Sequence, residues 1–263
     1  MSELLTPILL GVIEGITEFL PISSTGHLLI AEHWLGHRSD VFNVVIQAGA
    51  ILAVVLIYRQ RLWQLATGLG DARNRDYALK LLAAFAITAA LGFLATKLGF
   101  KLPQTVTPVA WALILGGVWM IGAETLAARQ PERSEITWRV AILVGLAQVV
   151  AGIFPGTSRS AATIFVAMVA GTGSRPAATE FAFLVGIPTM FAASAYELLK
   201  ATKAGGTHED WSALAVAFVV SLATAFVAVK WLLGYIRTHR FTAFAVYRIV
   251  LGVALLIALP AGV

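Results

Sequence analysis

Cysteine is absent from this chain of 263 residues, and only 13% of the residues are charged. Without cysteine the chain has no disulfide, no thiolate nucleophile and no cysteine-ligated metal, and its redox compartment is not readable. Soluble domains contain about 25% charged residues. Together with 59% hydrophobic residues and a mean hydropathy of +0.83, the low charge predicts an all-α polytopic membrane protein, a single integral membrane domain over residues 1–263.

Two targeting or binding features are also missing. The first residues, Met-Ser-Glu-Leu-Leu, lack the basic region and cleavage site of a signal peptide, so we treat the whole chain as mature. The net charge of +5 comes from basic residues in short loops between apolar runs rather than in one patch. We therefore expect no nucleic-acid partner. The basic residues instead indicate which loops lie on which side of the membrane.

Apolar runs long enough to span a bilayer predict six transmembrane helices. Two further apolar stretches, residues 4–35 and 140–170, are interrupted by polar turns that contain proline, at 21–26 and 155–160. Non-helical backbone at membrane depth is tolerated only where protein buries it or where it lines a wet cavity. We therefore interpret both stretches as re-entrant helical hairpins. The six predicted spans are residues 41–58, 78–96, 106–126, 181–199, 211–233 and 242–259.

The two interrupted stretches resemble each other. Residues 11–24 align with residues 145–158 at an offset of 134, and glycine, proline and hydroxyl residues coincide. We predict an internal repeat with halves at about 1–128 and 137–263. Each half contains one hairpin and three spans, so the second half is inverted relative to the first and the hairpin tips meet near the midplane.

Basic residues assign the two faces of the membrane. The face with more of them is predicted to be cytoplasmic. Both termini and the mouth of the first hairpin then lie outside, while the second hairpin enters from the cytoplasm. The richer face carries Arg59, Arg61, Arg73, Arg75, Lys80, Arg129, Arg133, Arg139, Arg175, Arg237 and Arg240, and the other carries Arg38, Lys97, Lys101, Lys200 and Lys203.

Two carboxylates stand out in the first hairpin. Glu14 and Glu18 are four residues apart, so they share one face of a helix that Pro21 then ends. A charged side chain near the bilayer centre costs about 2.5 to 3.5 kcal/mol on insertion scales, and neighbouring carboxylates repel each other. A divalent cation, protonation of one carboxyl group, or an arginine from elsewhere in the chain could offset this cost.

The turn after the proline is rich in hydroxyl groups. Ser23, Ser24 and Thr25 are good N-cap residues for a second helix that we predict to start near Gly26. A helix N-terminus offers free N–H groups and a partial positive charge to an anion. The pattern predicts a site that handles phosphate. The alternative is that both carboxylates lie at the headgroup boundary and the hydroxyl residues only form a turn and a cap.

The second hairpin carries an arginine at the matching break. Residues 155–160 read Pro-Gly-Thr-Ser-Arg-Ser, and the alignment places Arg159 opposite Thr25. Because a guanidinium binds phosphate oxygens through paired hydrogen bonds, one half would supply acid–base or metal chemistry while the other holds phosphate. The alternative for Arg159 is a structural role at a helix end or beside a carboxylate.

Other polar residues within the spans are predicted to be structural. Asn43 and Gln47 could extend a polar face toward the site, but we favour interhelical hydrogen bonds. Glu180, Lys230 and Arg248 are ionisable residues for which we favour structural pairing.

The motifs as a whole resemble a known family. A Glu-x-x-x-Glu run leading into Pro-x-Ser-Ser-Thr-Gly-His, with Pro-Gly-x-Ser-Arg-Ser in the second half, is similar to the undecaprenyl-pyrophosphate phosphatases of the bacitracin-resistance type. The resemblance covers essentially the whole chain. It implies a multi-pass hydrolase of the bacterial inner membrane that removes the terminal phosphate from a polyprenyl pyrophosphate lipid for peptidoglycan synthesis. It also implies a divalent cation, Mg²⁺ or Ca²⁺, and a site that faces the periplasm. A homodimer is compatible with the resemblance but does not follow from it.

The resemblance assigns roles residue by residue. Glu14 and Glu18 would bind the metal and activate water, and Ser24 would be the nucleophile. His27 would be its general base or an alternative nucleophile. A water positioned by Glu18 would hydrolyse the phosphoserine, and direct attack by water remains the alternative. The pyrophosphate would be bound by Arg159, Ser23, Thr25, Gly26, Ser158, Ser160 and Thr163.

Two other classes fit part of the pattern. Inverted repeats with broken helices are typical of membrane transporters, so a transporter or a lipid-phosphate flippase is the alternative function. A carrier, however, needs no nucleophile. Another class of membrane lipid phosphatases has similar Ser-Gly-His and Ser-Arg motifs, but it requires a histidine and an aspartate soon after the arginine, which Arg159 lacks.

Overall fold

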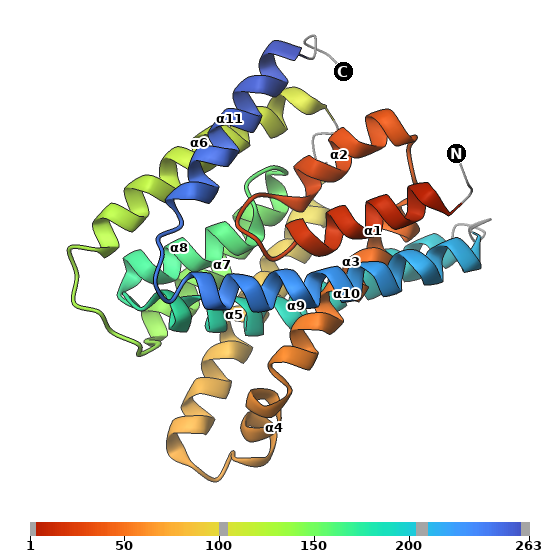
Figure 1. Ribbon diagram of the computed structural model, residues 1–263. Coiled ribbons are helices and arrows are strands. Elements are labelled where there is room, and N and C mark those ends of the chain that lie inside the picture. Colours follow the sequence, from red (N-terminus) through yellow and green to blue (C-terminus); the bar gives the residue numbers. More distant parts are fainter. Residues whose placement is uncertain (1–3, 100–104, 204–209, 259–263) are drawn as a thin grey trace.

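The computed structural model describes residues 4–99, 105–203 and 210–258, and these form helices without a β-strand (Figure 1). Short turns or loops separate the helices. Their bounds are α1 (Leu5–Thr17), α2 (Ser24–Leu35), α3 (Asp40–Ile57), α4 (Arg59–Thr67), α5 (Ala72–Lys97), α6 (Val106–Ala127), α7 (Trp138–Ile153), α8 (Arg159–Ala170), α9 (Arg175–Lys203), α10 (Trp211–Tyr235) and α11 (Thr242–Ala258).

Five helices of the described chain are long and apolar enough to cross a membrane, namely α3, α5, α6, α9 and α10. The sixth predicted span forms α11, which has 17 residues and belongs to the shorter apolar helices. The last residue of that predicted span, Leu259, lies outside the described residues. The class of polytopic helical membrane protein is confirmed, while the number of six spans stays a prediction.

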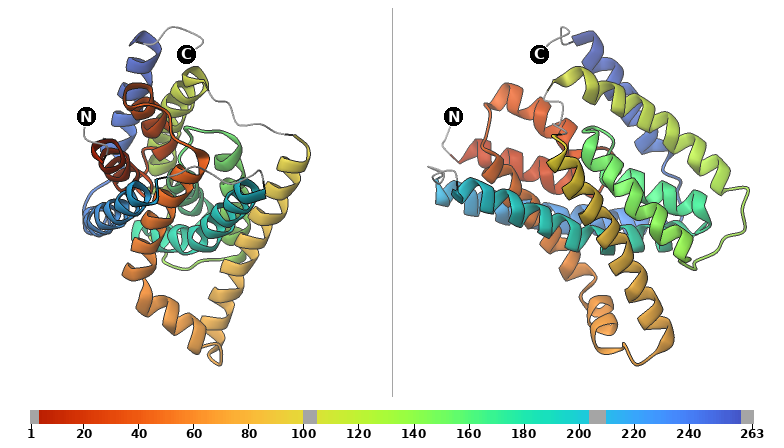
Figure 2. Two further views of the ribbon diagram at one scale, coloured as in Figure 1. Left: turned by 90° about the vertical axis from the view of Figure 1, so that its right-hand side faces the viewer. Right: turned by 180° about the vertical axis from the view of Figure 1, so that it is seen from behind.

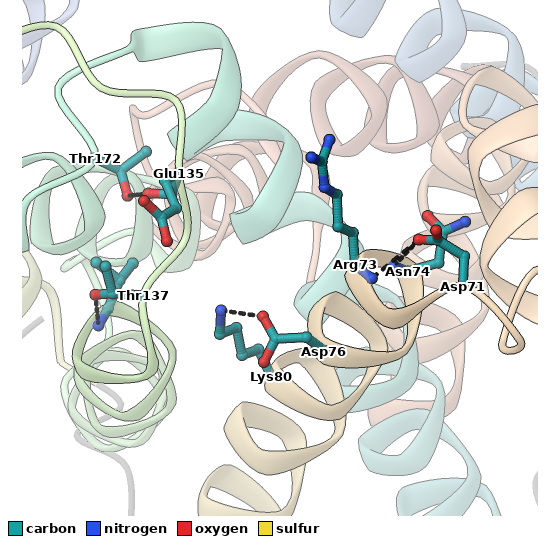
Figure 3. Close-up of polar contacts among 9 residues, drawn as sticks. Asp71, Arg73, Asn74, Asp76, Lys80, Glu135, Thr137 and Thr172 are labelled. Atoms are coloured by element: carbon teal, nitrogen blue, oxygen red, sulfur yellow. Dashed lines mark hydrogen bonds and ion pairs between the residues drawn. The ribbon is translucent and has the colours of Figure 1, made fainter.

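Helix α4 was not predicted. It has nine residues, too few and too polar for a span, and its Trp63 is largely exposed. Together with the start of α5 it extends away from the other helices (Figure 1, Figure 2). The carboxylate of Asp71 begins α5 by accepting the backbone N–H groups of Arg73 and Asn74, both at 2.9 Å (Figure 3).

The loop before α7 is fixed by hydroxyl groups. Thr137 Oγ1 accepts the backbone N–H of Val140 at 3.3 Å and so caps α7 (Figure 3). Thr172 Oγ1, just after α8, donates to the carbonyl oxygen of Glu135 at 2.9 Å. The bond from Thr172 to Glu135 holds the two ends of the second hairpin close together.

Each hairpin packs against a long helix from the other half of the chain. Helix α1 lies along α10, and α7 lies along α5. A Cβ at Gly11 would be 2.6 Å from the carbonyl oxygen of Ala217, and a Cβ at Gly145 would be 2.8 Å from that of Ala84. Helices α6 and α11 pack side by side (Figure 1, Figure 2). Glycine therefore permits the same kind of close contact in both halves.

Aromatic side chains fix the first turn against the core. Phe19, in the turn between α1 and α2, packs edge-on against Phe183 of α9, with ring centroids 5.1 Å apart. Both side chains are buried. This packing anchors the turn in the helical bundle, where Ser23 is buried, Ser24 is half-buried and Thr25 is exposed.

Candidate active site

The first predicted hairpin is a helix, a turn and a second helix. Helix α2 begins at Ser24, so the predicted start near Gly26 was too late. Ser23 is the N-cap, and its Oγ accepts the backbone N–H of Gly26 at 3.4 Å. Its φ of 75° lies in the left-handed region, which residues other than glycine rarely adopt.

The second hairpin uses the same backbone conformation. Ser158 caps α8 with a φ of 68°, and its Oγ accepts the N–H three residues later at 3.3 Å. The structural counterpart of Ser158 is therefore Ser23, because the second turn has one residue more between proline and cap. This corrects the ungapped alignment, since Arg159 corresponds to Ser24 and not to Thr25.

The N-terminal ends of α2 and α8 meet at a cavity of about 40 Å³. In Figure 1 the turns of both hairpins lie near the middle of the molecule. The cavity brings together predicted site residues from both halves of the chain, along with residues that were not predicted. It is lined by Glu18, Ser23, Ser24, Thr25, Gln47, Ala151, Pro155, Gly156, Ser158 and Arg159.

Ser24 is hydrogen-bonded to Glu18. Its hydroxyl donates to Oε2 of Glu18, and the amide of Gln47 on α3 donates to Oε1 at 3.5 Å. The carboxylate is thus held between two donors. Because the Glu18 side chain is buried, little of it is accessible to water. A carboxylate that accepts a serine hydroxyl can remove its proton when the oxygen attacks. Gln47 thus extends the polar face of α3 to the site, which was the less favoured of its two predicted roles.

His27 lies beside the turn and forms no hydrogen bond with Ser24. Its Nδ1 lies 2.7 Å from the carbonyl oxygen of Ser23, and its Nε2 lies 2.7 Å from the hydroxyl of Tyr247 on α11. A carbonyl can only accept, so Nδ1 carries a hydrogen, and a neutral ring in this tautomer accepts the tyrosine O–H at Nε2. The two rings are stacked. Sequence analysis missed Tyr247, because a tyrosine near the end of a span is usually an interface anchor.

Glu14 could hold a cation together with Glu18. It is buried one helical turn before Glu18, and its Oε2 has no hydrogen-bond partner among the described residues. The described chain contains no cluster of three or more histidine, cysteine or acidic residues. Mg²⁺ is usually bound by about one or two carboxylates together with substrate phosphates. The pair of carboxylates and the orphaned oxygen fit that mode of binding.

Arg159 is half-buried at the start of α8, and its Nη1 has no hydrogen-bond partner among the described residues. Two neighbours predicted to line the pocket are used differently. Ser160 Oγ donates to the carbonyl oxygen of Leu20 at 3.0 Å, and Thr163 Oγ1 donates to that of Arg159 at 2.8 Å. Arg159 is thus free to bind an anion, while the two hydroxyls hold backbone.

The remaining ionisable residues divide into two kinds. Glu180 makes the predicted structural pair, with Arg61 at 3.2 Å, and the Lys230 ammonium lies 4.7 Å from the ring centroid of Phe226. Arg248 differs. It donates to backbone carbonyl oxygens and, within the described residues, forms no ion pair with a carboxylate.

These features define a class of protein. It is a polytopic helical membrane protein with a polar site between two helical hairpins, where one hairpin supplies a carboxylate and serine pair and the other an arginine. The chain belongs to the family of the bacitracin resistance protein BacA, which matches residues 7–254.

Two relatives illustrate how far the similarity extends. A protein of Rhizobium johnstonii named undecaprenyl-diphosphatase is 72% identical over 249 residues, which are 94% of each chain. One of Xanthomonas euvesicatoria pv. vesicatoria with the same name is 65% identical over 262 residues, which are 99% of each chain. The predicted family is confirmed.

Proposed function

We propose that this chain is an integral membrane phosphatase that hydrolyses undecaprenyl pyrophosphate to undecaprenyl phosphate and inorganic phosphate. The reaction recycles the lipid carrier for cell-wall synthesis. The observation that carries the proposal is the Ser24 hydroxyl bound to the Glu18 carboxylate in one cavity with Arg159. A transporter would need charge compensation for its cargo but not a serine bound to a carboxylate. The names of the similar proteins support the same reaction.

The pyrophosphate would bind between the two turns. Arg159, with its unpartnered Nη1, donates to oxygens of the terminal phosphate. The starts of α2 and α8 both line the cavity, so the positive ends of two helices add to this attraction. These donors are in place before the reaction, so they stabilise the charge that develops on the phosphate oxygens.

Ser24 then acts as the nucleophile. Its Oγ attacks the terminal phosphorus, Glu18 takes the hydroxyl proton, and the bond to the bridging oxygen breaks. Glu18 passes this proton to the leaving undecaprenyl phosphate. A water deprotonated by Glu18 attacks the phosphoserine, and the proton returns to Ser24 Oγ as inorganic phosphate leaves.

His27 would act as a positioning residue in this scheme. Its N–H holds the carbonyl oxygen of Ser23, the residue with the unusual φ next to the nucleophile. Glu14 and Glu18 would hold Mg²⁺ or Ca²⁺, which supplies positive charge to the phosphate oxygens when bound. The orphaned Oε2 of Glu14 supports this assignment.

We also propose that the halves, at about 1–128 and 137–263, form an inverted repeat with six spans in the bacterial inner membrane. The matched contacts of α1 with α10 and α7 with α5, and the two positive-φ serines, support it. Both termini and the mouth of the site would face the periplasm. In the cysteine-free chain, a membrane-impermeant maleimide should label Trp34→Cys in intact cells and not Trp63→Cys, two exposed positions. Labelling of Trp63→Cys and not of Trp34→Cys would show that the protein has the opposite orientation in the membrane.

Phosphate release from undecaprenyl pyrophosphate by the purified protein in detergent tests the function. We expect release by the wild type that a chelator abolishes. Both Ser24→Ala and Arg159→Ala should lower kcat by about 100-fold or more, because each removes a group that acts in the transition state. A folded wild type that releases no phosphate with any of several polyprenyl lipids and cations would favour a transporter instead.

A further inference from the structure

Arg248, on α11, is the largest fully buried side chain of the described residues, with an exposed fraction of 0%. A buried charge is ordinarily paired with an opposite charge, because removing it from water is costly. Here the partners of the guanidinium are uncharged: three backbone carbonyl oxygens and the sulfur of Met120, which lies 3.7 Å from Nη1. An apolar side chain could fill the same space without the loss of hydration, so the guanidinium calls for an explanation other than packing.

The carbonyl oxygens belong to the turns of the two hairpins and to α6. Nη1 donates to the carbonyl oxygen of Pro21 at 3.4 Å. Nη2 donates to that of Gly156 at 2.9 Å and to that of Ala112 at 3.1 Å. One planar guanidinium thus joins two turns that are more than a hundred residues apart in sequence. Its fixed fork of N–H groups suits this task better than a flexible ammonium would.

The chain leaves space for this guanidinium. A Cβ at Gly116 on α6 would lie 2.1 Å from Nη2 of Arg248, so no other residue fits at Gly116 without moving it. Gly156 has a φ of 91°, and a Cβ there would be 2.8 Å from the carbonyl oxygen of Val109. Two glycines therefore permit the approach of the turn and of the guanidinium.

We propose that Arg248 is a positioning residue for the phosphatase reaction, which fixes the turn that carries Ser24 relative to the turn that carries Arg159. The proposal rests on the proposed function. Pro21 and Gly156 each lie a few residues before the reacting group of their hairpin. A shift of one turn relative to the other would move the nucleophile away from the bound phosphate, and a displacement of about 1 Å can lower a rate about 100-fold.

Arg248 does not line the cavity, so it acts through the turns rather than on the substrate. A second link between the turns is the bond from Ser160 Oγ to the carbonyl oxygen of Leu20 at 3.0 Å. Because this bond remains when Arg248 is replaced, the turns should loosen without separating. The expected defect is in the reaction rate rather than in folding or lipid binding.

The first test is steady-state kinetics with undecaprenyl pyrophosphate in detergent. We expect Arg248→Met to lower kcat about 100-fold and to leave KM within about threefold, because the groups that bind phosphate are intact. Arg248→Lys should recover part of kcat, since an ammonium still donates to carbonyl oxygens but lacks the rigid planar fork that spans both turns. Unchanged kcat in Arg248→Met, or a change in KM alone, would overturn the proposal.

Glycine substitutions on the same helices provide a matched series that leaves Arg248 in the chain. Gly116→Ala displaces the guanidinium and should lower kcat, whereas Gly122→Ala, whose added Cβ meets nothing within 4 Å, should behave as wild type. Gly252→Ala separates α6 from α11 at Ala110, with a Cβ 2.6 Å from its carbonyl oxygen, and controls for helix packing. An equal loss in Gly116→Ala and Gly252→Ala would assign the effect to packing and contradict the proposal.

Hydrogen exchange measured by mass spectrometry tests whether the two turns are less well fixed in the variants. In Arg248→Met, or in Gly116→Ala if the methionine variant does not fold, exchange should rise in peptides covering residues 18–24 and 154–160 and stay unchanged in α3 and α10. A uniform rise along the chain would show a general structural role and overturn the proposal. A wild type without phosphatase activity would instead contradict the proposed function.

Discussion

In the first hairpin Ser23 caps α2 with a φ of 75°, and in the second Ser158 caps α8 with a φ of 68°. Both caps follow a proline within the turn, and the N-termini of both capped helices line the same cavity. The side chains around these matched backbones differ in charge. The first hairpin has Glu14 and Glu18 one turn apart, while the second has Gln148 in a comparable place and adds Arg159.

This difference shows how a duplicated anion-binding turn can be divided between two tasks. Two negative turns would repel a pyrophosphate, and two positive turns would bind it without removing the proton of a nucleophile. With one hairpin of each kind, the substrate lies between a base and an anion site. Four pairs of variants break or sharpen the comparison, in order of decreasing effect.

Removing the charge of the first hairpin should have the largest effect. Glu18→Gln keeps the shape of the side chain but cannot take the proton of Ser24, so kcat should fall by about a thousandfold. Phosphate release by the purified variant measures this fall. Glu132→Gln, in an exposed part of the loop before α7, is the control and should match wild type. A Glu18→Gln enzyme within tenfold of wild type would contradict the role of the carboxylate.

Making the second hairpin resemble the first should weaken substrate binding. Gln148 is buried on α7, one helical turn before Ala151 of the cavity wall. Gln148→Glu adds a negative charge near the phosphate site, and we expect KM to rise about tenfold from repulsion across this short distance. Gln148→Met, which removes the amide without adding charge, should leave KM nearly unchanged. Equal effects of both variants would argue against charge as the cause.

Loosening the Glu18 carboxylate should have a moderate effect. Gln47→Leu removes the amide that donates to Oε1 at 3.5 Å, and kcat should fall about five- to tenfold, as for the loss of one hydrogen bond. Asn43→Leu is the matched control on α3, because its amide donates to Glu32 at 2.9 Å, away from the cavity. A larger loss of kcat in Asn43→Leu than in Gln47→Leu would contradict the orienting role.

Changing the serine caps should have the smallest effect and should act on stability. Ser158→Ala removes the cap and keeps the left-handed φ, so it should destabilise the protein by about 1 to 2 kcal/mol. Ser158→Gly also loses the cap but relieves the φ strain, and its melting temperature in detergent should stay close to that of wild type. The same order is expected for Ser23. If Ser158→Ala were as stable as Ser158→Gly, the positive φ at residue 158 would not strain the backbone.

The breaks in the hairpins were predictable from sequence because their causes are local. A proline follows the end of each first helix within four residues, and a hydroxyl residue caps each second helix, so the turns could be placed to within a few residues. The family and the polytopic class were also confirmed, since they rest on long motifs and on composition.

The contacts around His27 were not predictable, because they depend on residues distant in sequence. The family resemblance implied that His27 would take the proton of Ser24 or act as an alternative nucleophile. In the structure Ser24 donates to Glu18 instead, and His27 is held between the Ser23 carbonyl and Tyr247, which is 220 residues away. Arg248 joins the two turns from 227 and 92 residues away. An ungapped alignment also missed the additional residue in the second turn.

Identifying the phosphorylated residue would test the central claim most directly. The wild type would be mixed with undecaprenyl pyrophosphate, quenched during turnover under conditions that preserve phosphohistidine, digested and sequenced by mass spectrometry. The account predicts phosphate on Ser24 and none in Ser24→Ala. Phosphate on His27, or full turnover without any phosphorylated residue, would contradict it.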